Sequence, residues 1–292
     1  MIANPGFYRL TMEDYVTDPC VTPSLNAGTL TRLLSASPAH AWAQHPRLNP
    51  NYKSEEREAF DLGAAAHALL FEGEDRMVVV RADSYRTKAA QEARDAARAE
   101  GKHPILEARY EEVFLMRDIA LQKIANCADL SGIRLDKDGV AEQTLIWREG
   151  DTMFRCRPDW RAHKGDVMVN YKTTAASANP GAWPRTMIGT GADIQATLEA
   201  RGNSALNDDK PTKVIFLVQE VEAPYACALI GLAPAFREFA TSKIECGIDI
   251  WRACMKTDSW PSYTDRIAYV EPPAWALSQH EEFMDAGFVL PN

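Results

Sequence analysis

Hydrophobic and polar positions follow helical spacing through most of the first 130 residues. Four leucines supply one apolar face within residues 24–37, and Pro38 follows directly, so we expect a capped helix that ends at this proline. The same spacing predicts three further helices, at 54–71, 87–100 and 106–126, and the RMVVV run predicts a short strand at 76–80. The pattern therefore indicates an N-terminal region built mainly of helices.

The pattern changes in the middle of the chain, where short apolar runs alternate with turn-forming residues. These runs predict strands at 141–147, 152–158 and 167–172, separated by REGD and HKGD turns. Two helices, two strands and one long helix are expected next, at 179–188, 192–203, 213–220, 224–230 and 233–256. This order predicts an α/β fold with a mixed central β-sheet flanked by helices and an N-terminal helical region.

The chain contains neither an internal repeat nor a low-complexity linker, so its 292 residues suit one domain. We expect a helical cap over residues 1–130 and a core over residues 131–256. Residues 257–292 are rich in proline and aromatic side chains and are expected to wrap the surface as a tail.

Composition narrows the picture only slightly. The net charge of −9 argues against a protein coated in basic surface, although a small basic channel within an acidic body would still bind DNA. No apolar run is long enough to span a membrane, and the first residues lack the pattern of a signal peptide, so a cytoplasmic location is expected. The six cysteines form no CxxC pair and are expected to be free thiols.

The stretch RCRPDWRAHKGDVMVNYKTT brings candidate catalytic residues together. If the HKGD turn is symmetric, Ala162 pairs with Val167, and counting back sets Asp159 directly opposite Asn170. Such cross-strand partners have Cβ atoms about 4.5–5.5 Å apart. The strand period of two then places Lys172 on the same face as Asn170.

A carboxylate, a second oxygen ligand and an ammonium group on one small patch suit phosphodiester hydrolysis. Oxygen ligands hold Mg²⁺, and a lysine supports the attacking water or the developing charge. The simpler interpretation is a surface hairpin with an incidental ion pair. The VMV run before Asn170 favours a buried strand instead, and charge retained in a buried strand usually serves a function.

The spacing Asp-x10-(D/E)-x-Lys resembles the signature of the PD-(D/E)XK nucleases, in particular their RecB-like and lambda-exonuclease-like branch. Upstream, DLGAAAHALLFEG resembles that branch's Gly-x-x-x-His helix, with Gly63 and His67 on one helical face. Downstream, Gln195 resembles the branch's glutamine motif, although Glu199 stands where the family usually has a tyrosine. LTRLLSASPAHAW, FLVQEVEAPYACAL and WPSYTDRIAYVEPPAW extend the resemblance to the exodeoxyribonuclease VIII type of exonuclease domain.

The resemblance implies a restriction-endonuclease-like core and Mg²⁺-dependent degradation of one strand from duplex DNA ends, 5′ to 3′, with Mn²⁺ as a substitute. It implies a single-strand annealing protein as recombination partner and a homo-oligomeric ring. His67 and Asp159 would bind the metal, and Asn170 would stand in place of the second carboxylate. The Tyr171 carbonyl would complete the ligand set, Lys172 would activate the water, and Gln195 would lie near the substrate.

Asn170 departs from the family pattern, because an amide brings no negative charge to the metal. Two unit charges a few Å apart interact by roughly 4 kcal/mol at an effective dielectric of about 20, so the loss of the carboxylate charge weakens the hold on the metal. Three accounts stay open: an inactivated variant, which we favour; a silent DNA-end-binding module; or another carboxylate in its place, with Asp166 and Glu142 nearest in sequence. A nuclease that acts on RNA or that nicks duplexes is a further alternative.

Basic and aromatic residues near the proposed site are candidates for DNA binding. The five cations that would form a phosphate-guiding rim are Arg155, Arg157, Arg161, Lys164 and Arg185. Such contacts position DNA without reading its sequence. Trp160 would stack on a base at the DNA end, although an aromatic beside a buried strand more often belongs to the core.

Overall fold

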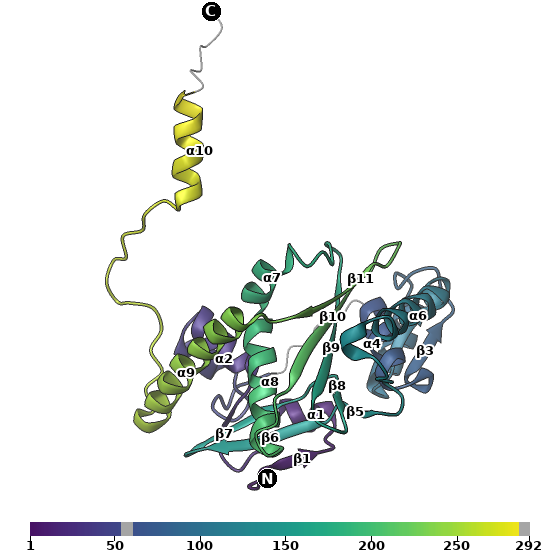
Figure 1. Ribbon diagram of the computed structural model, residues 1–292, viewed down its shortest axis with the longest axis horizontal. Helices are drawn as coiled ribbons and strands as arrows, with labels where there is room; N and C mark the ends of the chain where they lie inside the picture. Colours follow the sequence, from purple (N-terminus) through teal and green to yellow (C-terminus); the bar gives the residue numbers. More distant parts are fainter. Residues whose placement is uncertain (54–60, 286–292) are drawn as a thin grey trace, which may run out of the picture.

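A five-stranded mixed sheet forms the centre of the molecule (Figure 1). The computed structural model describes residues 1–53 and 61–285. The sheet has the order β11-β10-β9-β8-β5, in which β9 and β10 are parallel and the other neighbours antiparallel. Its strands are β5 (Gly139–Ala141), β8 (Trp160–Ala162), β9 (Val167–Thr174), β10 (Lys213–Glu220) and β11 (Cys227–Gly231).

Two smaller sheets complete the β-structure. A four-stranded sheet has the order β1-β6-β7-β2, and β3 and β4 form a parallel pair. Their strands are β1 (Gly6–Tyr8), β2 (Ser24–Leu25), β3 (Met77–Val80), β4 (His103–Leu106), β6 (Thr144–Glu149) and β7 (Thr152–Cys156). Because β1 and β2 pair with strands more than 100 residues later, the N-terminal segment belongs to the core.

Helices cover both faces of the central sheet, as the ribbon shows (Figure 1). One face packs against α2 (Ala27–Ser35), α7 (Trp183–Thr190), α8 (Ala192–Leu206) and α9 (Pro234–Thr257). The other face packs against α4 (Asp61–Phe71) and α6 (Tyr110–Ala125). The remaining helices are α1 (Met12–Val16), α3 (Pro38–Ala43), α5 (Lys88–Ala99), α10 (Ala274–Asp285) and the 3₁₀ turns Glu74–Arg76, Glu107–Arg109 and Ala128–Leu130.

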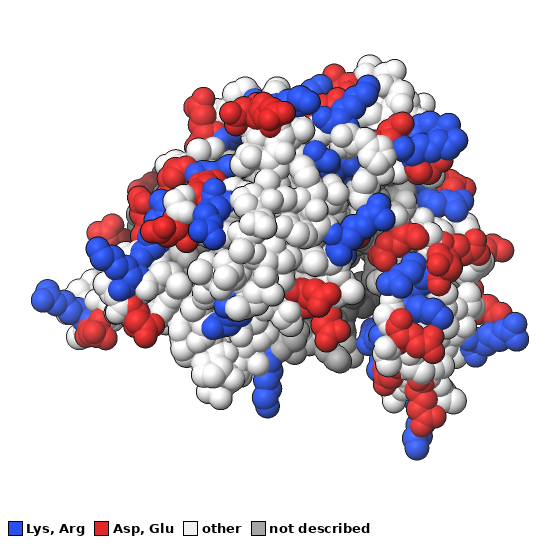
Figure 2. Space-filling model, turned by 90° about the horizontal axis from the view of Figure 1, so that it is seen from below, with Lys and Arg blue, Asp and Glu red and all other residues white. Residues whose placement is uncertain are grey.

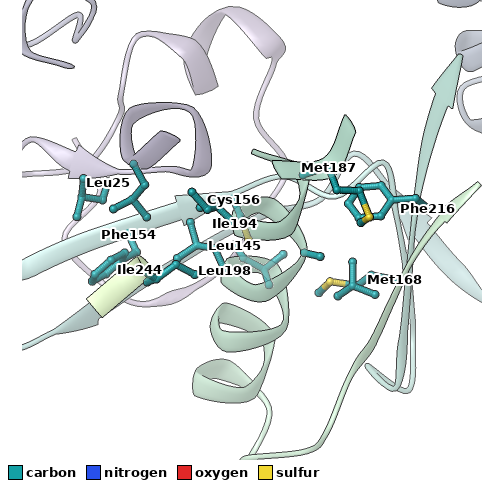
Figure 3. Packing of buried hydrophobic residues seen from close by; sticks show 14 of the residues in the cluster. Leu25, Leu145, Phe154, Cys156, Met168, Met187, Ile194, Leu198, Phe216 and Ile244 are labelled. Atoms are coloured by element: carbon teal, nitrogen blue, oxygen red, sulfur yellow. The ribbon is translucent and has the colours of Figure 1, made fainter. Parts of the chain in front are cut away.

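Alternation along β9 and β10 divides the core into two layers. Met168 and Phe216 point toward α7 and α8, where they join the cluster shown in Figure 3. Val169, Tyr171 and Leu217 point toward α4 and α6. Each fully buried large apolar side chain stabilises the fold by about 1.5–3 kcal/mol, so both helix layers are held firmly against the strands that carry the candidate site.

The predicted fold class is confirmed, but two predicted element boundaries near the N-terminus are wrong. Ser24 and Leu25 belong to a strand, and the helix begins after Asn26, whose side chain accepts a hydrogen bond from the Thr29 N–H at 2.8 Å. Pro38 starts a helix because its missing N–H costs nothing in the first turn, and Ser37 caps that helix. The predicted start of the 54–71 helix lies outside the described residues.

The tail does not wrap the body over its described length. Trp260 packs edge-on against Trp251 at 5.3 Å between ring centroids, and the Tyr263 ring lies 5.4 Å from that of His40. Beyond these contacts the chain is exposed, and α10 stands away from the body (Figure 1). No helix in the described part of the chain is both long and apolar enough to cross a membrane.

Candidate active site

The turn between β8 and β9 sets the register of the candidate site. Trp160 pairs with Val169, and Arg161 pairs with Met168, which is the predicted register. It places Asp159 beside Asn170, and the Asp159 N–H donates to the Asn170 Oδ1 at 3.4 Å. The predicted register is therefore confirmed, and the contact with the Asn170 side chain is made by the Asp159 backbone.

Helix α4 brings His67 to the same place. The His67 Nε2 lies 3.5 Å from Asp159 Oδ2 and 3.3 Å from Glu142 Oε1. One ligand atom from each of these three side chains lies within 4.8 Å of the others. An imidazole and two carboxylates at this spacing fit a divalent cation such as Mg²⁺ or Mn²⁺.

Gly63 lets α4 approach the sheet this closely. A Cβ added at Gly63 would lie 2.5 Å from the Thr173 Oγ1 on β9. His67 stands one helical turn further along the same face. The small residue and the metal-binding candidate are thus two parts of one helix–sheet contact.

Glu142 is held in place by its backbone and by an arginine. Its φ of 54° lies in the left-handed region, a conformation that costs about 1–3 kcal/mol in a non-glycine residue and clusters at functional sites. Its N–H donates to the Asp159 carbonyl at 3.0 Å. Arg157 donates to the Glu142 Oε2 at 2.5 Å and to the Leu10 carbonyl at 2.6 Å. Glu142 therefore supplies the second carboxylate of the cluster, whereas Asp166 is exposed in its turn.

The three side chains of the cluster shift one another's proton affinity. Burial lowers the pKa of His67, but the hydrogen bond and charge of Asp159, with Glu142, outweigh burial and raise it. Burial acts to raise the pKa of Asp159, but His67 and then Lys172 outweigh it and lower it. Burial also raises the pKa of Glu142 against the influence of Arg157. A cation that binds here competes with a proton for His67.

A second group of polar side chains is buried on the α8 side of Asn170. The Asn170 Nδ2 donates to Glu199 Oε2 at 2.6 Å, and its Oδ1 accepts from the Gln195 Nε2 at 3.1 Å. Gln195 also donates to Glu199 Oε1 at 2.9 Å. Burial raises the pKa of Glu199 to about 7. Sequence reasoning treated Glu199 only as a mismatch, although its four-residue spacing from Gln195 indicated a shared helical face.

Lys172 and Tyr171 take the opposite faces of β9 that the strand period predicts. The Lys172 Nζ lies 6.0 Å from the centroid of the Phe216 ring and forms no ion pair with any described residue. The Tyr171 N–H donates to Asp159 Oδ2 at 2.7 Å, and its hydroxyl donates to Gln219 at 2.6 Å. The proposed ligand role of the Tyr171 carbonyl stays a prediction.

Three of the predicted DNA-binding side chains are buried, so their assignment was wrong. Arg155 donates to the Ser24 carbonyl at 3.0 Å and pairs with Asp18 at 3.2 Å. Arg161 donates to Asn203 at 2.6 Å, and the Trp160 indole donates to the Leu135 carbonyl at 2.9 Å. The physical reason is tertiary packing: β2 of the second sheet accepts from Arg155, α8 accepts from Arg161, and the segment before β5 accepts from Trp160.

The other rim candidates differ in their surroundings. Arg157 is nearly buried and forms an ion pair with Glu142. It therefore supports the cluster, and its charge is not available to a DNA phosphate. Lys164 and Arg185 are exposed, and their role stays a prediction. A hollow of about 570 Å³ lies beside Glu142 and Arg157. Its other basic lining residues are Arg9, Lys137 and His163. A larger hollow of about 850 Å³ lies along α8 and includes none of the cluster residues.

A mixed sheet with Asn170 and Lys172 on β9, Asp159 directly before the neighbouring β8, and His67 on the helix beside them, defines the PD-(D/E)XK nuclease class. Residues 28–273 match the model of one family in that class, described as a PDDEXK-like domain of unknown function (DUF3799). The chain belongs to this family. The closer likeness to the exodeoxyribonuclease VIII type is not established by this match.

A solved structure shares the fold. It comes from Eubacterium rectale and is provisionally described as an exonuclease. The alignment covers 93% of this chain and 98% of that chain, with a TM-score of 0.57 and 12% sequence identity. At this identity the likeness concerns the fold alone. The comparison with curated proteins gives no significant match.

Proposed function

We propose that this chain is a metal-dependent deoxyribonuclease that degrades one strand of duplex DNA from its ends. The observation that carries the proposal is the His67, Glu142 and Asp159 cluster, with Lys172 close enough to lower the pKa of Asp159 and in no ion pair with any described residue. Family membership supports a nuclease-type function. Mg²⁺, the 5′-to-3′ direction and the preference for ends come from the resemblance and are part of the proposal.

The side chains of the site have different proposed roles in hydrolysis. His67, Glu142 and Asp159 would hold the cation, which when bound polarises the phosphate and lowers the pKa of water. Lys172 is the ammonium group nearest this cluster on β9, and its role is to hold the attacking water or to offset charge on the phosphoryl oxygens. Arg157 donates one hydrogen bond to Glu142 and a second to the Leu10 carbonyl, and so keeps the Glu142 carboxylate pointed at the centre.

The hollow beside Glu142 is proposed to take the phosphate backbone. Arg9 and Lys137 line it, are exposed, and form no ion pair with other described residues. Cations at this place would position a strand so that one phosphate meets the cluster. They take over the role first expected of the buried Arg155 and Arg161.

Glu142 favours the account of Asn170 in which another carboxylate substitutes. With Asp159 it gives the cluster two carboxylates even though position 170 carries an amide. The alternative is a catalytically silent module that holds DNA ends, and the amide at position 170 is the observation in its favour. An annealing protein and a homo-oligomeric ring remain proposals from the resemblance.

Three substrates test the proposed function in parallel. End-labelled linear duplex, covalently closed circular duplex and single-stranded RNA are incubated with the chain and Mg²⁺ or Mn²⁺, with EDTA as control. We expect degradation of the linear duplex alone. Cleavage of the circle would replace the exonuclease with an endonuclease, and cleavage of RNA would change the substrate class. End binding without cleavage in either metal would favour the silent module.

A further inference from the structure

The two positions that depart from the family pattern touch each other. Position 170 carries an amide where an acid is expected, and position 199 carries an acid where a tyrosine is expected. Their side chains meet at 2.6 Å between the Asn170 Nδ2 and Glu199 Oε2. The two departures therefore lie in one contact, in which β9 carries the uncharged side chain and α8 carries the acid.

We propose that Glu199 adds a third carboxylate to the site from α8, directly behind Asn170, beside the two that Glu142 and Asp159 bring to the cluster. The proposal rests on the proposed function, because it assigns a further residue to the same metal-dependent site. Glu199 acts from behind Asn170. It fixes the amide with Oδ1 turned toward Asp159, and it adds negative charge next to the cation.

Burial and pairing single out Glu199 among the acids of the described chain. Three acidic side chains are fully buried there: Asp18, Asp193 and Glu199. Asp18 pairs with Arg155 at 3.2 Å, and Asp193 pairs with Lys243 at 2.8 Å. Glu199 accepts hydrogen bonds from two neutral amides and forms no ion pair with any described residue, although the charge of Lys172 acts to lower its pKa from beyond ion-pair distance. A buried carboxylate without a cation is costly, so its retention favours a function that a bound cation completes.

The hydrogen bonds around Asn170 explain why the acid stands at only one of the two positions. The amide gives its N–H to Glu199 and turns its oxygen toward the Asp159 N–H and the Gln195 Nε2. An acid at position 170 as well would set two carboxylates against each other at hydrogen-bond distance. They would then have to share a proton or a cation. Asn170 and Glu199 are thus a matched pair.

A swap of the two groups tests the proposal. Glu199→Gln removes the acid, Asn170→Asp adds one, and the double variant Asn170→Asp/Glu199→Gln returns the carboxylate to the strand with almost unchanged side-chain shapes. We expect Glu199→Gln to weaken Mn²⁺ binding about 10- to 100-fold, the range typical for groups that support metal ligands. The double variant should recover to within about threefold of the parent chain.

Calorimetric titration of the metal-free chain with Mn²⁺ is the primary readout, with cleavage of linear duplex beside it. Asp193→Asn is the matched control, since it removes another buried carboxylate from α8 that faces Lys243. It should leave Mn²⁺ affinity unchanged. Unchanged affinity in Glu199→Gln, or failure of the double variant to recover, would overturn the proposal.

Two further outcomes keep the test decisive. If Glu199→Gln does not fold, the double variant is compared directly with the parent chain, and a loss of Mn²⁺ affinity beyond tenfold counts against the proposal. If no variant cleaves any nucleic acid, the proposed function fails. The pattern of Mn²⁺ affinities would still decide the role of Glu199.

Discussion

At the residue scale, the site combines a cation-binding cluster with a separate ammonium group. His67, Glu142 and Asp159 come from three different segments, and each is oriented by a partner. Lys172 has no ion-pair partner among the described residues, so its charge is available to a substrate. The two parts can therefore be tested independently by substitution.

Replacement of Lys172 by methionine should separate chemistry from metal binding. The change keeps the length of the side chain and removes its charge. We expect cleavage of linear duplex to fall about 10²–10⁴-fold, as for loss of a group that takes part in proton transfer. Mn²⁺ affinity should stay equal or rise slightly, because a nearby positive charge is gone. Loss of Mn²⁺ binding in this variant would show that Lys172 shapes the cluster instead.

His67 should make metal binding depend on pH. Its raised pKa means that a proton competes more strongly with the cation for the imidazole than it would at an ordinary histidine. Mn²⁺ affinity should therefore fall as the pH is lowered through the pKa of His67, as calorimetry at pH 8, 7 and 6 would measure. The stability of the metal-free chain should depend on pH in the opposite direction. The charged form of His67 stabilises the fold at low pH, and this contribution is lost as the pH rises.

The variant His67→Gln tests the predicted pH dependence of stability in the metal-free chain. In EDTA, the midpoint temperature of its thermal unfolding should be lower than that of the parent chain, and this difference should be larger at pH 6 than at pH 8. A difference that is equal at both values would mean that His67 carries no pH-dependent stabilisation.

At the element scale, the site depends on how closely α4 and α8 approach β9. The hairpin register was predictable from sequence because a four-residue turn and a period of two fix which residues face each other. The position of α8 was not, since it depends on packing against strands far away in the sequence. For this reason Glu199 was overlooked, and the buried Arg155 and Arg161 were mistaken for a surface rim.

The contact between α4 and β9 should tolerate no added methyl group. Gly63→Ala would place a Cβ 2.5 Å from the Thr173 Oγ1 and push His67 away from Asp159. We expect a loss of about 1–3 kcal/mol in the free energy of unfolding, together with weaker Mn²⁺ binding. The double variant Gly63→Ala/Thr173→Ala should recover both quantities. Recovery of stability without metal binding would mean that Gly63 does not position His67.

At the scale of the whole molecule, an acidic protein must confine its DNA contacts to a small area. The chain carries a net charge of −9, and the face seen in Figure 2 shows basic and acidic side chains interspersed around an uncharged centre. Steep salt dependence requires many phosphate contacts. We therefore expect weak and shallowly salt-dependent binding away from the site.

The basic hollow beside Glu142 should account for part of the DNA affinity. Replacing Arg9 or Lys137 by alanine should weaken binding of a duplex end and reduce the salt slope by about one phosphate contact for each residue. Lys256→Ala, in the last turn of α9, serves as a matched control for charge. Fluorescence anisotropy in EDTA, at several salt concentrations, measures both quantities. Equal effects of all three changes would argue against a defined path for the strand.

The most direct test of the account compares the parent chain with Asp159→Asn on end-labelled linear duplex over a range of Mg²⁺ concentrations. The Asp159 carboxylate contacts His67 and accepts a hydrogen bond from the Tyr171 N–H, so its charge is central to the cluster. The account predicts cleavage by the parent chain that saturates with Mg²⁺ and is abolished by EDTA, and little or no cleavage by the variant. Equal cleavage by both chains would contradict it.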